Sequence, residues 1–107
     1  MGKYMSSKYN QDNTDISRGE HTMETRVAVI GIIVEEAKSV ESLNAILHEY
    51  GNYIIGRMGV PYRAKGINVI SVDIDAPGDI ISALAGKVGN LPGVSAKTAY
   101  SNVITVE

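Results

Sequence analysis

The chain has 107 residues, of which 44% are hydrophobic and 21% charged, and it contains no Cys, Trp or Phe. Its length suits a single domain. The lack of Cys excludes disulfides, thiolate metal sites and cysteine nucleophiles, and the net charge of −2 excludes a global positive field that would attract nucleic acid. The sequence also lacks a membrane-length apolar run and the apolar core of a signal peptide. We therefore predict a small soluble cytoplasmic protein with no direct nucleic-acid or membrane partner.

Residues 1–23 differ in composition from the rest of the chain. They are rich in Ser, Asn, Gln, Asp and Lys, and Ile16 is their only aliphatic β-branched residue. Such a segment buries too little apolar surface to offset the ~1–2 kcal/mol per residue that backbone ordering costs. We expect a disordered tail over 1–23, either a native leader or sequence added before a start at Met23, and a folded domain over 24–107.

The first half of this domain has the pattern of a strand and a helix. Residues 25–34 are β-branched and almost continuously apolar, as in a strand that is covered on both faces. Ser39 is suited to cap a helix that Gly51 ends in a left-handed conformation. Between them, apolar residues recur at helical spacing: Val40, Leu43, Ile46, Leu47 and Tyr50.

The second half predicts three more strands and another helix. A connection of turn formers, 61–66, joins strands over 53–60 and 67–75. Pro77 opens a second helix, which ends near Gly89 and Pro92. Its apolar stripe contains Ile80, Ile81, Leu84, Val88 and Leu91. Residues 94–100 form the fourth strand, and 103–106 either continue it or add a short edge strand.

The predicted order of elements is β-α-β-β-α-β. Right-handed crossovers then place both helices on one face of a four-stranded antiparallel sheet. The fold class is therefore α+β with a ferredoxin-like arrangement.

Both faces of the first predicted strand are apolar. Val27, Val29 and Ile33 point to one side, and the residues between them, including Ile30 and Ile32, point to the other. Because the helices cover a single face of the sheet, the second set needs another cover. We expect a homo-oligomer, dimer or tetramer, that forms through sheet faces or edges. The alternative is a cover supplied by the tail or the C-terminal segment.

A basic cluster lies around the second strand and the connection that follows it. Arg57, Arg63 and Lys65 are close in sequence, with Tyr62 beside them. An Arg guanidinium binds a carboxylate or phosphate in two-point geometry, so the cluster could hold a small anionic effector. The alternatives are a charged loop tip and an intersubunit ion pair with the carboxylates that follow the first strand.

Four carboxylates could suggest acid–base chemistry or a hard cation. They are Glu35, Glu36, Asp73 and Asp75. The two aspartates alternate with Ile74 along a strand, so a solvated strand end explains them better. His48 is the single His of the folded part, and no Ser–His–acid spacing supports a triad. We predict no catalytic residues, no metal and no cofactor.

Four segments resemble the iron-only hydrogenase system regulators: residues 26–34, 40–50, 54–62 and 91–97. That family consists of small stand-alone proteins similar to ACT domains and to the C-terminal domain of the nickel-responsive regulator. The resemblance implies an ACT-like, non-catalytic regulatory domain that binds an effector or a protein partner. The candidate effector or interface residues are Arg57, Tyr62, Arg63, His48 and Tyr50. The alternatives are a transcription-regulator subunit that needs a separate DNA-binding partner, and a small-metabolite enzyme that uses the carboxylates.

The nickel regulator's ligand pattern is not reproduced in this chain. His48 matches its first ligand, but the other three positions hold Gly59, Pro61 and Ile67, whose side chains cannot ligate a metal. The resemblance to the nickel regulator therefore implies a shared fold but not a shared metal site.

Overall fold

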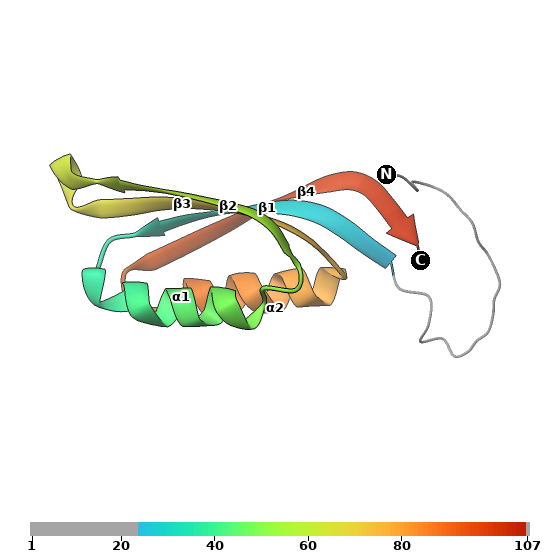
Figure 1. The fold of residues 1–107 in the computed structure, drawn as a ribbon, viewed down its shortest axis with the longest axis horizontal. Helices are drawn as coiled ribbons and strands as arrows, with labels where there is room; N and C mark the ends of the chain where they lie inside the picture. The colour runs from blue at the N-terminus through green and yellow to red at the C-terminus, as the bar shows by residue number, and fades with distance from the viewer. Residues whose placement is uncertain (1–23, 107) are drawn as a thin grey trace.

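The computed structural model describes residues 24–106, so the tail predicted over 1–23 lies outside the described residues. The strands and helices follow the predicted order (Figure 1). They are β1 (Glu24–Val34), the 3-10 turn η1 (Ala37–Ser39), α1 (Val40–Glu49), β2 (Ile54–Tyr62), the 3-10 turn η2 (Arg63–Lys65), β3 (Ile67–Ala76), α2 (Gly78–Gly89) and β4 (Val94–Val106).

The four strands form one antiparallel sheet in the order β2-β3-β1-β4. Both helices lie on the same side of this sheet (Figure 1). The predicted α+β, ferredoxin-like fold is confirmed. Within residues 24–106, neither helix has the length and apolar character needed to cross a membrane.

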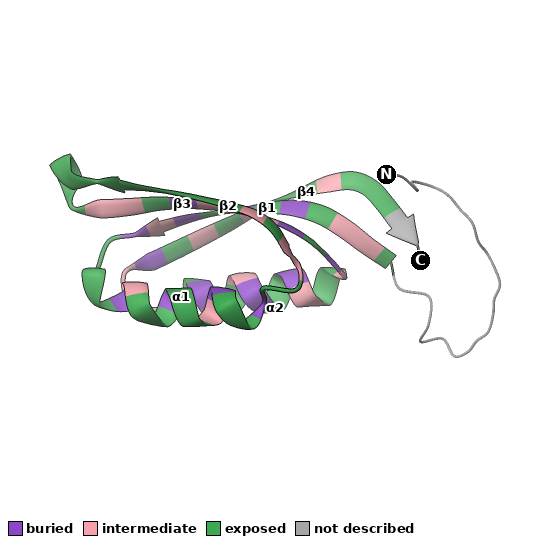
Figure 2. Ribbon diagram, viewed as in Figure 1, coloured by how far each residue is buried: buried purple, intermediate pink, exposed green. Residues whose placement is uncertain are grey.

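The core lies between the helices and one face of the sheet. Even-numbered residues of β1 point into it: Ala28, Ile30, Ile32 and Val34 are at most 1% exposed. They meet fully buried residues of β3 and both helices, namely Val72, Ile74, Leu43, Ile81, Leu84 and Val88. The helical stripes predicted from spacing therefore face the sheet (Figure 2).

The opposite face of the sheet, which we call the free face, is not covered by either helix of residues 24–106. Val27 and Val29 of β1 are 41% and 40% exposed there. The strand register places Met58, Val60 and Val69 on the same face, and all three are exposed. The prediction that β1 is apolar on both sides is confirmed. In the single chain, its second side faces outward.

The ends of α1 differ from the prediction. Ser39 makes no side-chain capping bond, because η1 already holds its backbone in a helical conformation; its Oγ instead donates to the carbonyl oxygen of Pro92 at 2.6 Å. Gly51 does not take the left-handed conformation, since the positive-φ glycines of the described chain are Gly66 and Gly93. The helix closes through a bond from the Gly51 N–H to the His48 carbonyl at 3.1 Å.

At Gly93, neighbouring atoms leave no room for a side chain. Its φ is +67°, and a Cβ added there would lie 2.5 Å from Cγ of Glu36. The Glu35 N–H donates to its carbonyl at 2.7 Å, which ties the end of β1 to the start of β4. Gly66 has a similar φ of +66° but open space around it.

Residues 103–106 continue β4 and do not form a separate edge strand. The register with β1 shifts between Arg26 and Ala28, and this irregularity accommodates the break in the sequence pattern. Arg26 Nη2 donates to the Ser101 carbonyl at 2.8 Å, and its guanidinium lies 4.7 Å from the centroid of the Tyr100 ring. One arginine thus secures the irregular pairing.

Candidate functional site

The candidate site begins with an irregularity in the edge strand β2. Ile54 pairs with Ile74, and Gly56 pairs with Asp73, so Ile55 is an extra residue in the strand. Ile54 and Arg57 are three positions apart and would lie on opposite faces of a regular strand. The bulge turns both toward the helices, because Arg57 pairs with the buried Val72.

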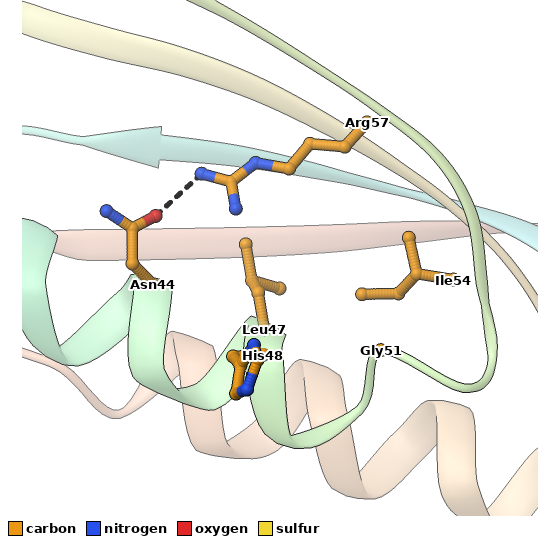
Figure 3. Close-up of a pocket in the computed structure, with 6 residues that line it drawn as sticks. All are labelled: Asn44, Leu47, His48, Gly51, Ile54 and Arg57. Carbon is orange, nitrogen blue, oxygen red and sulfur yellow. Dashed lines mark hydrogen bonds between the residues drawn. The ribbon is translucent and has the colours of Figure 1, made fainter.

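Helix α1 supplies the other wall of the site. Asn44, Leu47 and His48 lie at helical spacing along the side of α1 next to β2. Together with Gly51 and the two β2 residues they line an open groove of about 320 Å³. Its full lining is Asn44, Leu47, His48, Gly51, Ile54 and Arg57 (Figure 3). We call this the α1–β2 groove.

A hydrogen bond spans one end of the α1–β2 groove. Nη2 of Arg57 donates to Oδ1 of Asn44 at 2.6 Å (Figure 3). Leu47 lies next to this bond and Ile54 lies toward the other end (Figure 3). They give the groove an apolar floor, since Leu47 is 2% exposed and Ile54 packs against the core. His48 sits on the outer part of the helix, and Gly51 adds no side chain at the far end. The groove is thus cationic at one end and apolar at the other.

The five predicted site residues fall in three places. His48 and Arg57 both line the groove. Tyr62 and Arg63 lie at the end of the β2–β3 hairpin, five and six positions further along an extended chain, which corresponds to roughly 17–20 Å. Tyr50 is buried and faces α2. The basic cluster of the sequence is therefore not one site in the folded chain.

The surroundings of Tyr50 form a contact between the two helices. Nζ of Lys87 lies 5.1 Å from the centroid of the Tyr50 ring and 3.5 Å from Oε2 of Glu49. Hydrogen bonding to Tyr50, followed by attraction to Glu49, raises the pKa of Lys87 above its ordinary value. The aromatic ring predicted as an effector contact thus joins α1 to α2.

Sequence reasoning missed Asn44 and the apolar floor of the groove. Asn44 precedes His48 by one helical turn, and this i, i+4 spacing was the available signal. Nothing in the spacing of β2 indicates the bulge that brings Ile54 and Arg57 to the same side. Gly56, directly after the extra residue, is a weak hint, because glycine is often found at bulges.

The structure gives no support for a metal or carboxylate centre. Across residues 24–106, no three His, Cys, Asp or Glu side chains are grouped as metal ligands. Asp73 pairs with Val29 and lies five strand positions, roughly 17 Å, from Val34, after which Glu35 and Glu36 follow. The four carboxylates considered above are therefore spread along the sheet.

The chain that forms this fold and this groove matches one protein-family model. The family model described as "Iron-only hydrogenase system regulator, putative" matches residues 26–98, a span that includes the whole α1–β2 groove. Because this match covers more than half of the chain, the protein belongs to that family.

A solved structure agrees with this assignment. The chain is similar to the uncharacterized protein TM1266 from Thermotoga maritima, with 31% sequence identity and a TM-score of 0.69. The similarity covers 71% of this chain and 96% of that one. No curated protein matches the chain. The resemblance noted in the sequence is confirmed.

Proposed function

We propose that the protein is a non-catalytic, ACT-like regulatory domain that acts as a homo-oligomer, a dimer or tetramer, in the control of an iron-only hydrogenase system. It senses a small effector or a protein partner. The family description supports the regulatory role, and the spread of the carboxylates along the sheet supports the lack of catalysis. The apolar free face is the observation that supports assembly into a homo-oligomer.

The apolar residues of the free face are contiguous across strands. Val60 pairs with Val69, and Val69 pairs in turn with Ile33, so an apolar row crosses three strands. Val29 and Val27 extend the surface along β1. Contiguous apolar surface of this kind marks an interaction site more often than a solvated face.

A second copy of the chain is the occupant that this face suits. The charged residues of the free face have opposite signs on different strands, with Asp73 on β3 and Lys97 on β4. A copy turned over by a twofold axis along the strands would set β1 over β3 and β4 over β2. The Lys97 side of one copy would then meet the Asp73 side of the other. Such a pairing uses the same surface twice, as a twofold dimer requires.

The assembly is tested by measuring the mass of the full chain with light scattering at ~10 µM, a concentration at which typical specific interfaces are occupied. We expect a dimer or tetramer of the 11.5 kDa chain. Val29→Lys should reduce the mass to that of a monomer without unfolding the protein. Ala83→Lys, which adds the same charge on an exposed position of α2, should leave the mass unchanged. A monomeric wild type, or a Val29→Lys variant that stays assembled, contradicts this interface.

The regulatory role is tested in the host organism. Deletion of the gene should change iron-only hydrogenase activity, and the wild-type gene should restore it. The Val29→Lys gene should fail to restore it if the oligomer is the working form. Unchanged hydrogenase activity after deletion contradicts the proposed role.

A further inference from the structure

Arg57 differs from Lys87 and Lys38, each of which lies next to a carboxylate. Lys87 lies next to Glu49, and Lys38 lies next to Glu36. Among residues 24–106, no carboxylate is within ion-pairing distance of Arg57, and its recorded partner is the neutral amide of Asn44. Asn44 fixes the guanidinium in place without neutralising its charge. Such a group is oriented in advance to receive an anion.

The electrostatics of α1 indicate where an anion can lie in the groove. Gly51 and His48 lie at the C-terminal end of the helix, where the helix dipole and free carbonyls disfavour negative charge. Asn44 lies in the middle of the helix, away from that end. The favourable position for an anion is therefore beside Arg57 and Asn44. The part of the groove near Gly51 and Ile54 suits an uncharged group.

The size and lining of the groove limit the ligand further. A volume of about 320 Å³ corresponds to roughly ten water-sized groups. Leu47 and Ile54 offer apolar contact next to the charged end. The groove holds one arginine, which matches the single charge and planar shape of a carboxylate better than the higher charge of a phosphate.

We propose that the α1–β2 groove binds a small carboxylate with an apolar body, held at its charged end by Arg57. This inference rests on the proposed function, because it assigns a ligand class to the sensing domain. The guanidinium donates to both carboxylate oxygens while Asn44 holds it in orientation. The apolar body lies on Leu47 and Ile54.

The test uses calorimetric titration of the full chain with benzoate, which carries a carboxylate on a small apolar ring. Benzamide has nearly the same shape without the charge, and inorganic phosphate supplies charge without the ring. We expect benzoate to bind at least tenfold more tightly than either. Equal binding of benzamide would show that the groove selects shape alone and would overturn the inference, as would tighter binding of phosphate.

Two variants and one control variant locate the site. Arg57→Gln should weaken benzoate binding at least tenfold, whereas Arg63→Gln, the same change at the exposed hairpin end, should alter it less than twofold. Asn44→Asp should also weaken benzoate binding at least tenfold, because the new carboxylate would neutralise Arg57 while the arginine remains. Unchanged binding in Arg57→Gln or Asn44→Asp overturns the inference; the thermal unfolding midpoint of each variant verifies that it is folded.

Failure of the groove proposal can be distinguished from failure of the proposed oligomer. The mass of each sample is measured in the same buffer. Benzoate binding by a monomeric wild type would uphold the groove and contradict the assembly. An oligomer that does not bind benzoate would uphold the assembly and contradict the ligand proposed for the groove.

Discussion

The two faces of the sheet are built from similar residues and have different surroundings. Along β1, Ile30 and Ile32 are at most 1% exposed beneath the helices, while Val27 and Val29 are about 40% exposed on the free face. Both sets are apolar and mostly β-branched. Composition therefore identifies β1 as a strand with two apolar sides, but the position of the helices decides which side is buried within the chain.

The largest expected effect comes from shortening a side chain on each side of β1. Ile30→Ala should lower the free energy of unfolding by about 3 kcal/mol, because it leaves a cavity beneath the helices. Val29→Ala should cost less than about 1 kcal/mol in dilute samples, where its side chain stays half-exposed. Urea denaturation of both variants measures the difference. Equal losses at low protein concentration would mean that the two faces are not distinct within one chain.

The second comparison concerns two glycines with nearly the same φ. Gly93→Ala should lower the free energy of unfolding by about 2 kcal/mol, because its Cβ would collide with Glu36. Gly66→Ala, at the open hairpin end, should cost about 1 kcal/mol, which is the backbone strain alone. Denaturation curves of the two variants give both values. A larger loss at Gly66 would contradict the role assigned to packing around Gly93.

The smallest effect is the pH dependence of the contact between α1 and α2. The pKa of Lys87 is raised in the folded protein by Tyr50 and Glu49, so its charge favours folding below the ordinary value of 10.5. That stabilisation is lost as the pH rises through the folded-state pKa. The thermal midpoint of wild type should therefore approach that of Lys87→Gln between about pH 9 and pH 12. A constant difference across that range would contradict the contact.

The sequence was sufficient for the order of the elements and for most of the core. The alternation in β1 and the helical spacing of Leu43, Leu47, Leu84 and Val88 depend on local periodicity, which the structure keeps. The end of α1 was predicted wrongly at Gly51, because a short bond to His48 closes the helix without a left-handed residue.

The candidate site could be predicted only in part. Arg57 and His48 do line one groove, but an extended strand carries Tyr62 and Arg63 away from it. Tyr50 is directed to α2 by the helical rotation that separates it from His48. Asn44 acquires its role through a contact across 13 positions, and a single sequence does not reveal such pairings.

The extra residue at position 55 also determines where the edge strand tolerates a change of length. Removing one residue between Arg57 and Tyr62 would exchange the sides of the strand residues beyond the gap, so apolar side chains would move from the free face to the helix side. Loss of Ile55 would instead restore even pairing and leave each group on its own side. Homologues that differ in length along this strand should therefore gain or lose their residue at this position.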